Sequence, residues 1–197
     1  EVLAARRIDG GIPYFGRAFD LAAARSAHAA FEHWSHEGLL GDIVAIVRSF
    51  RPQVIVSVYP DSVLDGNGQH IAVMQLAREA FVAAAQDTSR YAETTYGKPW
   101  SASKLYGPGA GLSIDADEYD PVIGKTFSAL AAQARAQYRS QGLAASPAVR
   151  RNEIVRLGRV LSRVDESTPP TRELSLFDGI DTTVARLTSS VSEDLAS

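Results

Sequence analysis

The residues best suited to chemistry lie in one short stretch, Asp65-Gly-Asn-Gly-Gln-His70. The neutral imidazole of His70 can bind Zn²⁺ at about 2.0–2.1 Å, and the glycines on either side of Asn67 let the backbone turn sharply and come close to a ligand. Asp65 can orient the imidazole by accepting a hydrogen bond, although turn formation explains an aspartate here about as well. On spacing alone, a surface or capping histidine is the commoner occurrence. The stretch therefore offers one metal ligand, with a capping histidine as the alternative.

Other polar side chains are candidates for contacting a substrate. Arg17 and Asp20 follow the first helical segment and can bind sugar hydroxyls, but a surface ion pair is the simpler explanation. Tyr138 lies on a long predicted helix and can line a cleft, whereas a solvated helix face is the default. The stretch Gly107-Pro-Gly-Ala-Gly111 lacks the Lys-Ser/Thr ending of a phosphate-binding loop, so we expect a flexible loop there.

The elements around residue 70 follow an α/β pattern. Apolar residues recur every three or four positions from Gly38 to Phe50, which predicts a helix with one apolar face. Arg51-Pro52 ends that helix. Residues 53–59 are short and β-branched, typical of a strand buried on both faces of a parallel sheet. A polar loop follows, and a second helix is expected over Gln69 to Gln86. Ligands of α/β folds bind beyond the carboxyl ends of the strands, where residues 60–70 lie.

The rest of the chain extends this α/β prediction. A helix is expected over residues 1–7, ending at the glycine pair that follows Asp9. The other expected elements are a helix over 21–34, a strand at 104–106, a long helix over 121–141 and strands within 154–164. Residues 1–164 are expected to form the main domain, and residues 165–197 a linker and tail leading to a possible further region.

Composition excludes several classes of protein. The 197 residues are 45% hydrophobic and 22% charged, an ordinary globular composition. The net charge of −3 and the scattered Lys and Arg argue against a nucleic-acid partner. The absence of cysteine excludes disulfides and cysteine-based metal sites. No apolar run approaches the roughly 18 residues of a membrane span. The N-terminus has neither a starting methionine nor a signal peptide, so we expect the chain to begin within a longer protein.

Several segments together resemble one enzyme family. The strand that begins Arg51-Pro-Gln-Val-Ile-Val, the glycine turn up to His70 and the helical Ala77-Arg-Glu-Ala-Phe81 are similar to the second metal-binding segment of PIG-L (LmbE-like) deacetylases. Further segments, spread in the right order over nearly the whole chain, resemble the long exported branch of that family. They are Leu3–Gly11, Tyr14–Asp20, Glu118–Pro121, Arg139–Gln141 and Ser175–Asp181.

The resemblance implies a fold and a function. The fold is a Rossmann-like three-layer α/β/α sandwich with a mostly parallel sheet, incomplete here at its N-terminus. The activity is zinc-dependent hydrolysis that removes acetyl from an N-acetylated amino sugar or glycoconjugate. Family members hold one Zn²⁺ through a His and an Asp of an N-terminal H-P-D-D-E loop and a His of the glycine turn, which corresponds to His70. The other ligands are therefore expected upstream of Glu1, and the long relatives favour a periplasmic or extracellular location.

Two positions depart from the family pattern. Asn67 stands where the family has the first histidine of the turn, and Tyr138 stands where it has the histidine of H-R-S-Q. Asparagine can donate a hydrogen bond to an oxyanion but cannot transfer a proton, and such acid–base help typically supplies about 10²–10⁴-fold in rate. We therefore name Asn67 and Asp65 as candidate catalytic residues, and Arg17, Asp20 and Tyr138 as candidate substrate contacts. The alternative is a catalytically impaired relative that binds carbohydrate or serves as a scaffold.

Overall fold

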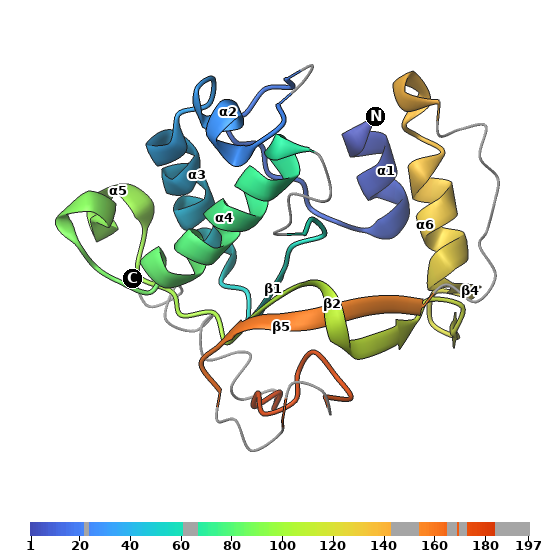
Figure 1. Cartoon of the computed structure of the whole chain (residues 1–197). Coiled ribbons are helices and arrows are strands. Elements are labelled where there is room, and N and C mark those ends of the chain that lie inside the picture. The colour runs from blue at the N-terminus through green and yellow to red at the C-terminus, as the bar shows by residue number, and fades with distance from the viewer. Residues whose placement is uncertain (22–23, 61–66, 143–153, 165–168, 170–172, 184–197) are drawn as a thin grey trace. The chain divides into compact units, whose positions relative to one another are not determined.

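The computed structural model describes residues 1–21, 24–60, 67–142, 154–164, 169 and 173–183 (Figure 1). The helices are α1 (Val2–Asp9), α2 (Ala27–Phe31), α3 (His36–Phe50), α4 (Gly68–Ala83), α5 (Glu93–Tyr96) and α6 (Phe127–Arg135), with the 3₁₀ helices η2 (Ser89–Tyr91) and η3 (Arg139–Gln141). The strands are β1 (Val54–Val56), β2 (Lys104–Asp115), β3 (Tyr119–Asp120), β4 (Lys125–Thr126) and β5 (Ile154–Ser162). Among these residues no helix combines the length and the apolarity that crossing a bilayer requires.

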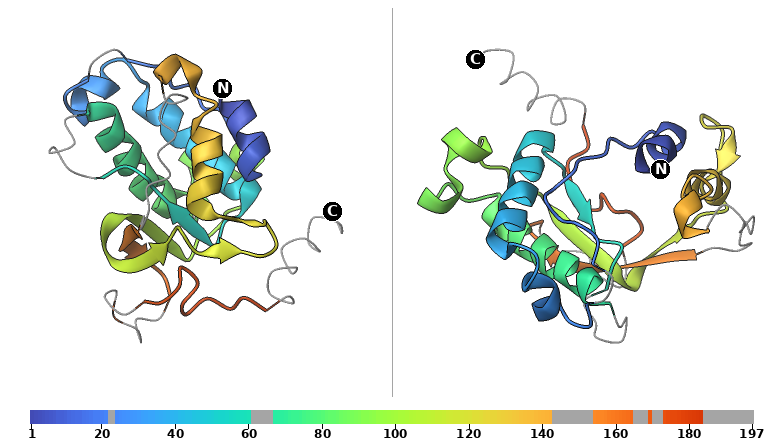
Figure 2. Two further views of the ribbon diagram at one scale, coloured as in Figure 1. Left: turned by 90° about the vertical axis from the view of Figure 1, so that its right-hand side faces the viewer. Right: turned by 90° about the horizontal axis from the view of Figure 1, so that it is seen from above.

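The chain divides into two compact units. Unit 1 comprises Glu1–Phe15 and Ser113–Arg156, and unit 2 comprises Gly16–Leu112 and Leu157–Ser197. In unit 1, α1 packs against α6, and β3 pairs antiparallel with β4 (Figure 2). Helix α1 ends as predicted at Gly10, whose φ of 76° lies in the left-handed region that glycine adopts easily.

The three-stranded sheet of unit 2 has both parallel and antiparallel strands. Its strand order is β1-β2-β5, and β1 runs parallel to β2 with Val54 opposite Lys104. Strand β5 runs antiparallel to β2, because Arg163 N–H donates to Ser103 O at one end while Gly158 lies beside Gly109 further along. The predicted α/β class is confirmed. The expectation of a mostly parallel sheet is wrong for this part of the chain, since only three residue pairs are parallel.

The glycine-rich stretch predicted as a flexible loop is instead the middle of β2. A Cβ on Gly109 would lie 3.2 Å from the Cα of Gly158, and one on Gly107 would overlap the end of the Met74 side chain. Small residues are needed here because a neighbouring backbone and a helix side chain approach β2 closely. The glycines therefore serve strand packing.

One face of the sheet is covered by α3 and α4, which lie side by side (Figures 1 and 2). Helix α3 forms where its apolar period predicted it: Ser35 caps it by accepting a hydrogen bond from Gly38 N–H, and Arg51 ends it in a left-handed conformation (φ 55°) before Pro52. The buried side chains of α3 and α4 form one core. They include Leu39, Leu40, Val44, Val47, Ile71, Leu76 and Ala80.

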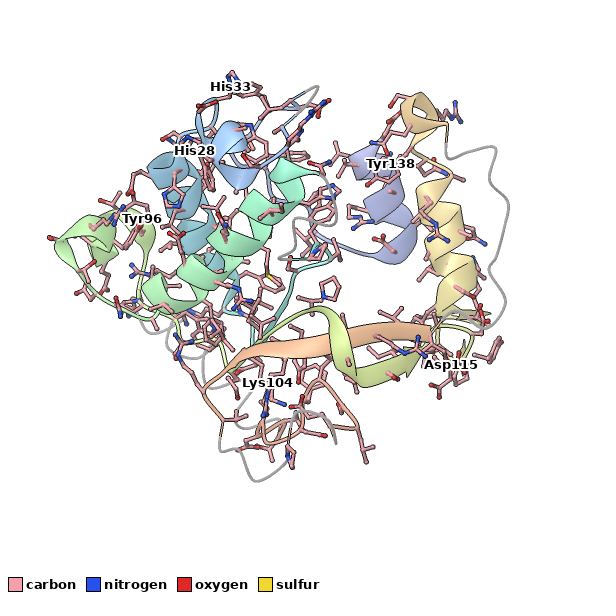
Figure 3. All side chains as sticks on the ribbon, viewed as in Figure 1. His28, His33, Tyr96, Lys104, Asp115 and Tyr138 are labelled. Carbon is pink, nitrogen blue, oxygen red and sulfur yellow. The ribbon has the colours of Figure 1, made fainter. Side chains whose placement is uncertain are left out.

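A buried ion cluster lies among the strand residues and the segment 173–183. Lys104 Nζ contacts Glu173 Oε1 at 2.7 Å, and Arg159 contacts the same oxygen at 3.2 Å (Figure 3). Lys104 and Glu173 are 0% and 5% exposed. Burial also raises the pKa of Tyr106, whose hydroxyl accepts from Lys104. Part of the segment expected to be a linker and tail is therefore tied to the sheet.

Several predicted boundaries differ from the observed ones. Within the helix expected over 21–34, the structure shows α2, which begins at Ala27 because Ser26 caps it. The helix expected over 121–141 is shorter, because residues 119–126 form the β3–β4 hairpin and Thr126 then caps α6. Strand β1 is not buried on both faces: it is the edge of the sheet, and Val56 and Val58 are 42% and 72% exposed.

Candidate functional site

Helix α4 begins at the glycine turn, and Asn67 is its cap. The Asn67 side-chain oxygen accepts a hydrogen bond from Gln69 N–H at 3.0 Å, while the backbone of Asn67 stays extended. Asparagine is among the best residues at this position because it satisfies one of the open N–H groups of the helix. Asn67, which stands where the PIG-L resemblance expects a histidine, thus has a structural role in this chain.

Gly68 is required by a close approach of two backbones. Its N–H donates to Ala24 O at 2.6 Å, and a Cβ there would overlap the carbonyl group of Ser26. The sequence predicted a glycine that lets the backbone approach a ligand. At Gly68 the approaching group is the backbone before α2, which fixes the start of α4 against the rest of unit 2.

His70 lies in the first turn of α4, and its ring is stacked on Tyr59. The ring centroids are 3.9 Å apart and the planes differ by 12°. The Asn67 side-chain nitrogen lies 3.4 Å from His70 Nε2 and can donate to it in the tautomer that leaves Nε2 unprotonated. Because Tyr59 follows β1, the imidazole lies near the carboxyl end of that strand, and its ring plane is held by an aromatic neighbour.

Ser57 holds the backbone that carries Tyr59. Its N–H donates to Tyr106 O at 2.9 Å, which extends the parallel ladder beyond β1. Its hydroxyl accepts from Tyr59 N–H at 3.3 Å and donates to Tyr59 O at 3.2 Å. Sequence reasoning missed both Ser57 and Tyr59. A serine three positions and a tyrosine one position before Pro60, at the end of a strand, are the only signal that the sequence contains.

Arg17 forms an ion pair with a residue that the sequence did not indicate. Its guanidinium donates to both carboxylate oxygens of Asp42 on α3, at 2.7 and 2.9 Å, and its backbone N–H donates to one of them. The hydrogen bonds from Arg17 lower the pKa of Asp42, and the carboxylate raises the pKa of the guanidinium. The ion-pair explanation of Arg17 therefore fits the geometry, with Asp42 in place of Asp20, which is exposed.

The remaining candidates are Tyr138 and Asp65. Tyr138 belongs to unit 1, where it precedes η3 and its N–H donates to Arg135 O. In η3, Ser140 binds the carboxylate of Glu1 through its N–H and its hydroxyl, which lowers the pKa of that carboxyl. Asp65, the expected orienting residue, lies outside the described residues.

An apolar groove lies at β1, which in the described part of the chain has a strand on one side only. It measures about 250 Å³, and Tyr59, the residue that stacks on His70, is among its lining residues. Its other walls are aliphatic side chains of β1, α3 and α4. They include Ile43, Val47, Ile55, Val56, Val73 and Ala77. An edge strand next to an apolar groove has the features of a place where a further strand can pair.

The described residues supply one metal ligand at this position. His70 is only partly buried, and it lies at a strand end where α/β folds bind their ligands. Its ring is held in place by Tyr59, and fixed orientation is what a metal-binding imidazole needs. In the part of the chain that the structure describes, no three His, Cys, Asp or Glu side chains come together as a metal site. Comparison with protein-family models and with curated proteins gives no match for this chain.

Proposed function

We propose that this chain is part of a zinc-dependent deacetylase of the PIG-L (LmbE-like) type that acts on an N-acetylated amino sugar or glycoconjugate. The observation that carries the proposal is the position of His70, in the first turn of α4 near the carboxyl end of β1 and stacked on Tyr59. The motif resemblance supplies the zinc, the reaction and the substrate class.

Each residue of the turn has a role in the proposed site. His70 holds the Zn²⁺, which when bound activates water and polarises the acetamide carbonyl. Tyr59 keeps the imidazole in one plane, so that little further rotamer freedom is lost when the metal binds. Asn67 can donate a hydrogen bond to the developing oxyanion from its side-chain nitrogen while its oxygen continues to cap α4.

The remaining ligands, in this proposal, come from residues that precede Glu1 in a longer protein. A strand that pairs with the open edge of β1 would fill the apolar groove beside Ile55 and Val73. If that strand runs parallel to β1, its carboxyl end lies on the His70 side of the sheet, where an acidic loop can complete the metal site. Completion at this edge yields the proposed Rossmann-like three-layer architecture with more parallel strands.

The test measures zinc and acetate release in the longer protein that contains this chain. We expect one Zn²⁺ per chain and release of acetate from N-acetylglucosamine derivatives, both lost in His70→Ala. His33→Ala is the matched control, because His33 is an exposed histidine of the same unit and should leave both measurements unchanged. An intact protein that holds no zinc, or a His70→Ala variant that keeps it, would reject the proposal.

A second candidate function is carbohydrate binding without efficient catalysis. The observation that favours it is the engagement of Asn67 as the cap of α4, which serves the fold and provides no proton donor. In this case the protein still binds metal and sugar but releases acetate slowly.

Asn67→His in the longer protein distinguishes the two candidates. A gain in acetate release of about 10²-fold or more, with sugar affinity unchanged, indicates that the natural protein is a binder. Activity that is already substantial and falls in Asn67→His indicates an enzyme adapted to asparagine.

A further inference from the structure

A second groove lies over the C-terminal half of α4. It measures about 650 Å³, within the range of about 300–1,000 Å³ that small-molecule sites occupy. Its apolar lining comes from Leu40, Val82, Ala83 and Leu161. Val82 lies twelve positions after His70, about 18 Å along the helix axis, so this groove is separate from the proposed zinc site.

Several hydrogen-bond donors lie at this groove, together with Glu79, Gln86 and Thr88. Arg78, Arg90 and Tyr91 line it, and all three side chains are hydrogen-bond donors. Tyr91 is 6% exposed, and its hydroxyl oxygen is buried without a hydrogen-bond partner among the described residues. Burial raises the pKa of Tyr91, so the phenol stays protonated at neutral pH and remains a donor.

Both cations and carboxylates lie at the groove. Glu79 is the one carboxylate among the lining residues, and it lies 3.1 Å from His36 Nε2. Arg90 pairs with Glu37, but both side chains are more than half exposed, and such surface pairs contribute little and exchange partners easily. The guanidinium of Arg90 also lies over the Tyr91 ring, 5.5 Å from its centroid, which places cation and phenol together.

We propose that this groove binds an amphipathic monocarboxylate, with the apolar body along Val82 and Leu161 and the carboxylate at Arg90 and Tyr91. An apolar body alone would leave the donors unused, and a small anion alone would leave the apolar lining exposed. A molecule with both parts matches the lining.

Titration of the purified chain with sodium decanoate tests the proposal, followed by calorimetry and by backbone amide shifts. We expect a dissociation constant at or below about 1 mM, with the largest shifts at residues 78–91. Acetate has the charge without the apolar body, and decanol has the body without the charge, so both should bind at least about tenfold more weakly.

Two variants locate the site. Val82→Asp places a carboxylate in the groove at a side chain that is 46% exposed, and it should weaken decanoate at least about tenfold. Tyr91→Phe keeps the ring and should weaken it about three- to tenfold. The matched control is Val122→Asp, at a 93% exposed valine of unit 1, which should bind as the unchanged chain does.

Three results would overturn the inference. They are no decanoate binding, binding that Val82→Asp and Tyr91→Phe leave intact, and decanol binding as tight as decanoate. Zinc content and deacetylase activity do not bear on this outcome, so the two proposals fail independently.

Discussion

Replacing Gly68 by alanine tests how the start of α4 is held. The added Cβ would overlap the carbonyl group of Ser26, well inside the 3.0 Å that real Cβ atoms keep. Ser26 cannot easily yield, because its carbonyl accepts the first backbone hydrogen bond of α2 from Ala30, and its hydroxyl caps the same helix at Ala29. The clash must therefore be relieved by moving α4, which breaks the hydrogen bond from Gly68 N–H to Ala24 O.

The magnitude follows from these contacts. Overpacking against a backbone costs about 1–3 kcal/mol, and the lost hydrogen bond about 0.5–1.5 kcal/mol. The better helix propensity of alanine offsets up to about 1 kcal/mol. The expected loss of unfolding free energy is therefore about 2 kcal/mol. For a chain of this size that lowers Tm by about 4–8 °C.

Urea denaturation followed by circular dichroism measures the change, and the His70 ring protons in NMR spectra report whether its stacking on Tyr59 survives. The matched control is Gly38→Ala in the first turn of α3, where the three atoms nearest to the added Cβ belong to the side chains of Arg17 and Ser35 and not to a backbone. We expect the control to stay within about 1 kcal/mol of the unchanged chain. If Gly68→Ala is as stable as the control and the His70 signals do not move, the close-approach explanation is refuted.

Three further outcomes are expected. Glu173→Ala leaves Lys104 buried without its carboxylate and should lower the unfolding free energy by about 3–5 kcal/mol in urea titrations; a change below about 1 kcal/mol would contradict the buried ion pair. Asp42 should titrate below its ordinary 3.8 in carboxyl NMR, and Arg17→Gln should raise that value. Because the folded pKa is depressed, the stabilisation by this pair is present above pH 3.8 and is lost as pH falls through the folded pKa, so the stability gap between the unchanged chain and Arg17→Gln should close on acidification. Asn67→Ala removes the cap of α4 and should cost about 0.5–2 kcal/mol, whereas Asn67→Asp should retain most of it.

Some of the structure was predictable because it depends on neighbours in the sequence. The apolar period of residues 39–50 predicted α3, and the left-handed Gly10 that ends α1 was expected from a glycine pair. His70 was correctly placed in the first turn of a helix, whereas the role of Asn67 as the cap of that helix was not predicted. Capping, periodicity and helix termination act over a few residues, so a local pattern contains the information they need.

Other features were wrong or missed because they depend on distant partners. Residues 107–111 were expected to form a loop, yet in β2 their glycines accommodate Met74 and Gly158, which no local pattern indicates. The partner of Arg17 is Asp42, and the partner of Lys104 is Glu173, 69 residues away in a segment expected to be a linker. A sequence with many charges allows many pairings, and burial decides which of them forms.

The candidate site contains both kinds of information. The sequence by itself determined that an imidazole lies at the start of a helix, after a glycine turn and a short β-branched strand, because the chemistry of turns and helix starts is local. Only the tertiary structure decided that Tyr59 stacks on His70, that Ser57 holds Tyr59, and that β1 is an open edge beside an apolar groove. These relations arise where strand, loop and helix meet, and the packing of those elements selects among many orientations that the same local sequence permits.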